Sequence, residues 1–181
     1  NSYDLHHNSF VVEIASKDGY LLQIVRKSGI HCLGIEPAEE TSVIAENKGI
    51  NVINDFFSLK LSEEIVGKYG EADLVVANNV LAHVPDPVDI LCGMYRLLKP
   101  TGVASVEFHS VKELMQRQAI DTIYHEHMSY HSLFPLINFT KNLGLEELTE
   151  NTCKYMEGHP DQEGSSFCGR KNVEKFSYCP L

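Results

Sequence analysis

Short apolar runs rich in β-branched residues alternate with segments of helical spacing over the first 148 of the 181 residues. The apolar runs predict strands at residues 10–14, 32–35, 50–53, 73–77 and 103–108. The intervening segments predict helices at residues 21–27, 38–48, 59–69 and 88–98. Nearly continuous apolar strands separated by helices indicate a mostly parallel sheet covered on both faces. We therefore expect a doubly wound α/β fold, in which ligands bind at the carboxyl ends of the strands.

The pattern changes near residue 150. From Glu150 onward neither a strand period nor a helix period is clear. Chain-breaking residues interrupt this part of the sequence, namely Gly158, Pro160, Gly164 and Gly169. We therefore expect a core domain at residues 1–149 and an irregular tail at residues 150–181.

Composition narrows the class of protein. The chain has a net charge of -10 and a pI near 5.3, whereas nucleic-acid binders normally present a basic face. No window approaches the ~20 apolar residues that a membrane-spanning helix needs, and no secretory signal is recognisable. The five cysteines are scattered without a CxxC pair, so they predict neither a disulfide framework nor a zinc site. These features predict a reduced, cytoplasmic protein.

A turn suited to close ligand contact follows the first predicted strand. It reads EIASKDG from Glu13 to Gly19, and its small residues let a ligand approach the backbone. Glu36 ends the second strand, where a carboxylate can bind ribose hydroxyls. An ordinary tight turn with a solvated Glu36 is the structural alternative. Together the two motifs favour a cofactor that contains a nucleoside.

The glycine spacing bears on which cofactor this is. A dinucleotide fold prefers GxGxxG, whose second glycine makes room for the pyrophosphate, but here only Ala15 and Gly19 match. S-adenosylmethionine has no phosphates and fits better, since Glu13 and Asp18 would stabilise its sulfonium. A nicotinamide-dependent oxidoreductase is the weaker alternative.

Polar residues also follow the fourth predicted strand. Asn78 and Asn79 suit a polar ligand at the end of that strand, although either could instead cap a helix. His83 lies four residues further on and is either a site residue or a packed surface histidine.

The densest group of reactive side chains lies at residues 121–127, with the sequence DTIYHEH, and His131 follows closely. The segment offers a phenol, a carboxylate and two imidazoles. Histidine suits proton transfer near neutral pH, and a neighbouring carboxylate can orient it. Structural hydrogen bonding is an alternative, and so is a metal site formed by His125, His127 and His131.

Four segments in this order resemble one enzyme family. FVVEIASKDGYLL, LGIEP, ADLVVANNVLAHVPD and DTIYHEHMSYHSL are similar to the S-adenosylmethionine-dependent sugar C-methyltransferases, which methylate C-3 of nucleotide-activated deoxysugars. The resemblance covers about residues 8 to 148 and implies a class I methyltransferase core with a Rossmann-like fold. It implies a nucleotide-activated sugar as substrate and no metal. The blocks with YHEH and ANNVLAHVPD are its specific parts.

The resemblance also implies roles for individual residues. The methionine end of the cofactor would be lined by Glu13, Ala15, Asp18 and Gly19. Glu36 would hold the ribose, Asp55 and Phe56 would flank the adenine, and Asn78 and Asn79 would complete the site. His127 would act as the general base that removes the proton at sugar C3, beside a C4 ketone. Tyr124, Glu126 and His83 would position the sugar and support the enolate.

The chain also departs from this family. Family members are about twice as long, with a zinc-binding amino-terminal domain and a carboxyl-terminal domain that help enclose the nucleotide-sugar. After Leu148 they continue into a strand reading THGGSLRV, of which residues 159–166 retain a faint echo. We therefore expect a core that lacks the last antiparallel strand and leaves a sheet edge unpaired. The alternative function is a truncated, catalytically impaired cofactor-binding remnant, with weak or absent turnover on a full nucleotide-sugar.

Overall fold

The apolar segments predicted as strands form one sheet in the computed structural model, which describes residues 4–118, 120–142, 156–157 and 166–167. The strands are β1 (Phe10–Ile14), β2 (His31–Ile35), β3 (Val52–Ile53), β4 (Ala72–Asn78) and β5 (Leu98–Glu107). Their order is β3-β2-β1-β4-β5, and every pair is parallel. The chain winds outward from β1 to β3 and then returns to place β4 beside β1. This topology confirms the predicted doubly wound α/β fold.

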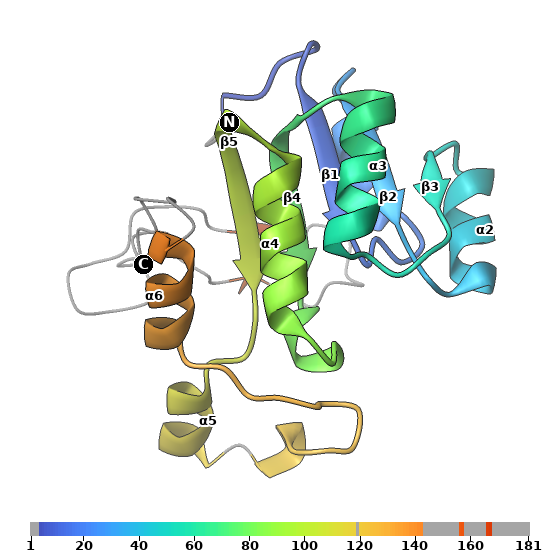
Figure 1. Ribbon diagram of the computed structural model, residues 1–181. Coiled ribbons are helices and arrows are strands. Elements are labelled where there is room, and N and C mark those ends of the chain that lie inside the picture. Colours follow the sequence, from blue (N-terminus) through green and yellow to red (C-terminus); the bar gives the residue numbers. More distant parts are fainter. Residues whose placement is uncertain (1–3, 119, 143–155, 158–165, 168–181) are drawn as a thin grey trace. The chain divides into compact units, whose positions relative to one another are not determined.

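Helices cover both faces of the sheet (Figure 1). They are α1 (Tyr20–Lys27), α2 (Glu39–Asn47), α3 (Leu59–Tyr69) and α4 (Pro87–Leu97). Ile65 of α3 and Met94 of α4 are buried in one apolar cluster, together with Val75 of the sheet. Leu22 of α1 and Ala45 of α2 belong to a second cluster on the other face. The central strands β1, β2 and β4 therefore bury both of their faces, which explains their continuous apolar runs in the sequence.

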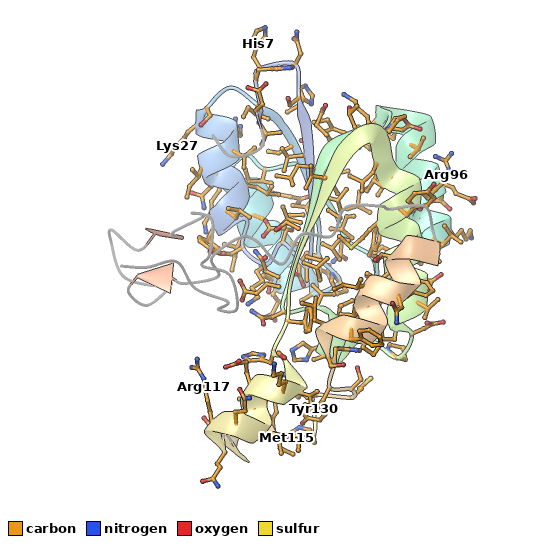
Figure 2. All side chains as sticks on the ribbon, turned by 90° about the vertical axis from the view of Figure 1, so that its left-hand side faces the viewer. His7, Lys27, Arg96, Met115, Arg117 and Tyr130 are labelled. Carbon is orange, nitrogen blue, oxygen red and sulfur yellow. The ribbon has the colours of Figure 1, made fainter. Side chains whose placement is uncertain are left out.

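Figure 2 shows the same layers with the sheet nearly edge-on. Lys27, at the end of α1, and Arg96, near the end of α4, lie on opposite sides of the sheet. His7 lies at the end of the sheet where β1 begins, and Tyr130 lies at the opposite end. The segment that contains Tyr130 therefore lies at the same end of the sheet as the carboxyl ends of the strands.

Capping side chains fix where α3 and α4 begin. Ser58 Oγ accepts a hydrogen bond from the backbone N–H of Leu61, at 3.1 Å. Asp86 Oδ1 accepts one from the N–H of Val88, at 2.9 Å, and Pro87 follows it as the first helical residue. Both patterns satisfy N–H groups that the helix itself leaves unpaired.

Strand β5 begins earlier than the sequence predicts. Leu98 pairs with Ala72 of β4, whereas the apolar pattern places the start of the strand at residue 103. Lys99 Nζ lies 2.9 and 2.8 Å from the carboxylate oxygens of Asp73, which fastens this early part of the strand. Lys99 and Pro100 therefore belong to strand β5 and do not merely end helix α4.

A segment at residues 110–131, called the histidine lobe below, follows β5. It contains the short helix α5 (Val111–Arg117) and the 3-10 turn η2 (Ile120–Thr122). Its two ends meet, since Ser110 bridges to His131 and the N–H of Val111 donates to the carbonyl of His131, at 2.8 Å. Figure 1 shows the lobe beyond the carboxyl ends of β4 and β5.

The chain divides into one unit up to Phe139 and a second unit from Thr140 onward. Helix α6 (Leu133–Asn142) links them, and Leu136 and Phe139 on it pack against the core of the first unit. In the second unit, β6 (Met156–Glu157) and β7 (Ser166–Phe167) pair antiparallel. Most of the tail expected at 150–181 lies outside the described residues. Within the described part of the chain, no helix is long and apolar enough to span a bilayer.

Candidate functional site

The loop after β1 has an unusual backbone. Ala15 has a φ of 54°, Lys17 a φ of 51° and Gly19 a φ of 72°. Three left-handed residues within five fold the loop tightly back over the end of β1. Such a φ costs a residue with a Cβ roughly 1–2 kcal/mol, so Ala15 and Lys17 hold this conformation under strain.

Gly19 is required by the packing of this loop as well as by its φ. A Cβ at this position would lie 3.1 Å from Ile50 Cγ1 and 3.2 Å from Ala45 Cβ. The Gly19 N–H donates to the carbonyl of Ser16, at 2.9 Å, which closes the turn before α1. The sequence motif therefore places a glycine where the first loop touches α2.

Glu13 is the buried acid of the site. Its side chain is only 4% exposed, and its Oε2 has no hydrogen-bond partner within the described residues. Burial raises the pKa of Glu13 to about 8; the positive charge of Lys17 opposes this shift, and the negative charge of Asp18 adds to it. Ser16 Oγ is also buried without a partner among the described residues. Unsatisfied buried polar atoms are costly and rare, and two of them at the end of β1 and in the loop that follows are what a polar or cationic ligand would satisfy.

Glu36 fastens the first two βα turns together. Its Oε2 accepts a hydrogen bond from the N–H of Lys17, and its Oε1 accepts one from the N–H of Ala38, both at 2.9 Å. Asn54, which follows β3, donates from Nδ2 to the Glu36 carbonyl at 2.8 Å. Each carboxylate oxygen has a second lone pair, so this arrangement leaves acceptor capacity for ribose hydroxyls. The sequence offered Glu36 as a ribose ligand or as a solvated residue, but it is only 6% exposed and holds the two turns together, a role that the sequence did not reveal.

The remaining predicted cofactor residues also lie at the carboxyl ends of the strands. Asp18 is ion-paired with Lys48, next to the end of α2, so its charge is partly compensated. Asp55 follows β3 and accepts a hydrogen bond from the N–H of Phe56, at 2.7 Å. The Phe56 ring is 76% exposed, which leaves an aromatic face open for stacking.

The two amides behave differently. Asn78 is the last residue of β4 and pairs with Glu107 of β5. Asn79 adopts a φ of 55°, and its Nδ2 donates to Glu107 Oε1 at 2.7 Å. The Asn79 N–H also donates to the Glu107 carbonyl, at 2.9 Å. Asn79 therefore anchors the end of β5, a role that the sequence motif did not reveal.

The hydrogen bond of His127 determines its neutral tautomer. Its Nδ1 lies 2.8 Å from the carbonyl oxygen of Thr122. A carbonyl can only accept, so Nδ1 carries the proton and Nε2 of the neutral ring has a free lone pair. This is the form in which an imidazole can remove a proton from a substrate.

His83 has the same arrangement. Its Nδ1 lies 3.1 Å from the carbonyl oxygen of Glu126, so its Nε2 also carries the lone pair. The rings of His83 and His127 meet edge to face, with centroids 4.8 Å apart. Two imidazoles whose Nε2 atoms can accept a proton therefore lie side by side.

Other rings surround His127. The ring centroid of Tyr124 lies 4.2 Å from that of His127, and the centroids of His109 and Tyr130 each lie 5.9 Å away. The structure thus brings together Tyr124, His83 and His127, three of the four residues predicted for catalysis.

The fourth predicted residue, Glu126, is placed differently. Its side chain is 64% exposed, and Oε1 lies 4.0 Å from Nε2 of the exposed His125. Glu126 contacts His83 through its backbone carbonyl and not through its carboxylate. Within the described residues, no three His, Cys, Asp or Glu side chains are grouped so that they could hold a metal ion.

The histidine lobe is fastened to the loop after β4. The N–H of Met128 donates to the carbonyl of Ala82, at 2.7 Å. Ser129 Oγ and His131 Nε2 lie 3.3 and 3.2 Å from the carbonyl oxygen of Leu81. His131, a candidate metal ligand in the sequence, therefore has a structural hydrogen bond in the η1 turn (Leu81–His83).

Sequence reasoning missed Glu107 and His109. Both lie at the carboxyl end of β5, one on each side of Phe108. The rule that directs attention to strand ends would have found them, but it was applied only to the strands at residues 10–14, 32–35 and 73–77. Tyr20, the first residue of α1, was also missed; its pKa is raised by burial and then by the carboxylates of Glu13, Glu107 and Asp18.

Solved structures share this fold. An S-adenosylmethionine-dependent methyltransferase from Archaeoglobus fulgidus has a TM-score of 0.64 at 18% identity, covering 83% of this chain and 66% of its own. The plantazolicin methyltransferase BpumL, solved in complex with SAH, has a TM-score of 0.58 at 13% identity, covering 75% of this chain and 55% of its own. These likenesses show a class I methyltransferase fold.

Curated relatives match by sequence. C-methyltransferase NovU of Streptomyces niveus is 34% identical over 148 residues, which is 82% of this chain and 35% of NovU. A ubiquinone biosynthesis O-methyltransferase of Methylococcus capsulatus is 30% identical over 95 residues, covering 50% of this chain and 39% of the relative. The chain therefore spans little more than a third of the length of these relatives.

The family assignment rests on a broader comparison. A family model described as a methyltransferase domain matches residues 5–150, which include the whole parallel sheet and the histidine lobe. The predicted class of enzyme is thereby confirmed, and the chain belongs to the methyltransferase-domain family.

Proposed function

We propose that this chain binds S-adenosylmethionine and methylates a carbon atom of a nucleotide-linked keto-deoxysugar, after removing a proton from that carbon. The observation that carries the proposal is the tautomer of His127, whose proton on Nδ1 is directed to Thr122 and whose Nε2 is free to act as a base. The 34% identity to a C-methyltransferase supports carbon as the atom that is methylated.

The first loop fits such a cofactor. The buried, unpaired oxygens of Glu13 and Ser16 offer acceptors for a cationic, hydrogen-bonding ligand. Glu36 presents its carboxylate at the end of β2, and the exposed ring of Phe56 follows the neighbouring strand β3. When bound, S-adenosylmethionine would supply an electrophilic methyl group on a positively charged sulfur.

The residues of the chain would then prepare the acceptor. His127 Nε2 takes the proton from the carbon beside the ketone, and the electron pair of that C–H bond passes into an enolate. The resulting imidazolium remains bound through Nδ1 to the Thr122 carbonyl, which stabilises its charge. Tyr124 lies against the His127 ring, where its hydroxyl can donate to the enolate oxygen.

Proton exchange tests the base without requiring methyl transfer. A nucleotide-linked 4-keto-6-deoxysugar is incubated with the chain in D2O, and deuterium at C3 is followed by NMR. The proposal expects enzyme-dependent exchange that His127→Ala abolishes, while His125→Ala, a change at a fully exposed neighbour, leaves it intact. Exchange that persists in His127→Ala would contradict the assignment of the base.

A second candidate follows from the O-methyltransferase relatives, which match half of this chain. An imidazole base would equally deprotonate a phenol, so His127 does not by itself distinguish the two acceptors. The position of a transferred isotope-labelled methyl group does. Label on a sugar carbon supports the proposal, and label on a phenolic oxygen supports O-methylation. A folded chain that binds S-adenosylhomocysteine but transfers no methyl group to either acceptor would instead be a cofactor-binding remnant.

A further inference from the structure

Two carboxylates on different strands point to the same face of the sheet. Glu13 of β1 pairs with Val76 of β4, and Val76 pairs with Ser105 of β5. Paired residues of parallel strands share a face, and so do residues two apart in a strand. Glu107 therefore lies on the same face of the sheet as Glu13, two residues nearer to the carboxyl ends of the strands. Val76 belongs to the apolar cluster of α1, which identifies this as the α1 side.

Glu107 is held in place by its neighbour. Asn79 binds it twice, through Nδ2 to Oε1 and through its backbone N–H to the Glu107 carbonyl. No Lys or Arg forms an ion pair with Glu107 within the part of the chain that the structure describes. Asp18, by contrast, is paired with Lys48. The charge of Glu107 is thus fixed in position but not compensated.

The buried acid completes the group. Glu13 is 4% exposed, and its Oε2 has no partner within the described residues. Burial raises the pKa of the Tyr20 hydroxyl at the start of α1, and the carboxylates of Glu13 and Glu107, once ionised, raise it further. Residues from β1, β5 and α1 therefore converge on one region, and one of them contains an unsatisfied acceptor.

We propose that Glu107, whose charge is uncompensated, recognises the positive charge of the sulfonium and so sets how strongly the site distinguishes S-adenosylmethionine from S-adenosylhomocysteine. This inference rests on the proposed cofactor. Transfer of the methyl group to the acceptor carbon leaves the sulfur as a neutral thioether. The attraction to Glu107 is then lost, which assists release of the product.

The test compares ligands that differ in charge at this position. Binding of S-adenosylmethionine, S-adenosylhomocysteine and sinefungin, which has a protonatable amine in place of the methylated sulfur, is measured by calorimetry for the natural chain and Glu107→Gln. Glutamine keeps an acceptor for Asn79 and removes only the charge. Glu64→Gln, on an exposed residue of α3, is the matched control for net charge.

The inference expects Glu107→Gln to weaken both cationic ligands by about tenfold relative to S-adenosylhomocysteine, the size of one charge interaction at a partly solvated site. The control should leave the ratio unchanged. If Glu107→Gln weakens all three ligands equally, or none, the inference is wrong while the proposed cofactor stands. If a folded natural chain binds none of the three, the proposed function itself fails.

Discussion

The two halves of the candidate site are built in different ways. The cofactor half is part of the sheet, since Glu13 belongs to a buried strand and Glu36 fastens two βα turns together. The histidine lobe is an appendage whose side chains are largely exposed, among them Met115 at 76% and Met128 at 65%. It is attached to the loop after β4 by hydrogen bonds, most of which join a side chain to a backbone carbonyl. We infer that cofactor binding depends on the core, whereas chemistry at the acceptor depends on the lobe.

Replacing His127 should have the largest effect, because it should lower turnover while leaving cofactor binding nearly unchanged. His127→Ala removes the proposed base and should lower turnover by ~10²–10⁴-fold, the usual contribution of a general base. Methyl transfer to the nucleotide-linked keto-sugar is the measurement, with His125→Ala as the control. A decrease of less than about tenfold would place the base elsewhere.

Raising the pH should destabilise the cofactor half. Glu13 keeps its proton in the folded chain up to a pKa of about 8, whereas the unfolded chain loses it near 4.5. Between these values the folded state binds more protons, so stability decreases as pH rises, by up to ~1.4 kcal/mol per pH unit.

Urea unfolding of the ligand-free chain between pH 5 and 8 tests this slope. Glu13→Gln cannot ionise and should flatten the slope, and Glu64→Gln on exposed α3 should not. An equal slope in the natural chain and in Glu13→Gln would show that Glu13 is ionised throughout.

A methyl group at Gly19 should disturb the first loop. Gly19→Ala adds a Cβ that lies 3.1 Å from Ile50, in addition to the cost of a left-handed φ. Gly29 has a φ of 74°, and a Cβ added there would have no atom within 4 Å. Gly29→Ala therefore measures only the free-energy cost of a left-handed φ for alanine. We expect roughly 1 kcal/mol for Gly29→Ala and about 1–2 kcal/mol more for Gly19→Ala. Equal losses in urea unfolding would show that the contact with Ile50 relaxes freely.

The smallest expected effect is a gain in stability. Ala15 has a φ of 54°, and Ala15→Gly relieves that strain while making the unfolded chain more flexible. The two terms oppose each other, and a net stabilisation of about 0.5 kcal/mol is expected. Ala104→Gly, on β5, offers no such relief and should destabilise. A loss of stability in Ala15→Gly would mean that the left-handed turn is not a strained conformation for alanine.

The sequence was most informative where periodicity and burial coincide. Every predicted strand of the main sheet is present, and the bounds of β1, β2 and β4 are predicted best because these strands are buried on both faces and form continuous apolar runs. Helix α3 matches its predicted bounds, since Ser58 caps it. The start of β5 was missed because Lys99 and Pro100 read as a break, whereas an ion pair to Asp73 keeps them in the sheet.

The site was predicted less completely than the fold. The order of the strands brings the ends of β1, β2 and β4 together, so the rule of strand ends correctly places Glu13, Glu36 and Asn78 at one edge of the sheet. The tautomer of His127 depends on the Thr122 carbonyl, and the placement of Glu107 depends on the register between β4 and β5. Neither is encoded in residue spacing, because both arise from backbone groups that meet only in the folded chain.

Calorimetric titration with S-adenosylhomocysteine tests the central claim most directly, with NAD as the control ligand and His127→Ala beside the natural chain. The account predicts saturable binding of S-adenosylhomocysteine with the same Kd in both proteins, and no binding of NAD. Preferential binding of NAD, or the absence of S-adenosylhomocysteine binding by a folded chain, would contradict it.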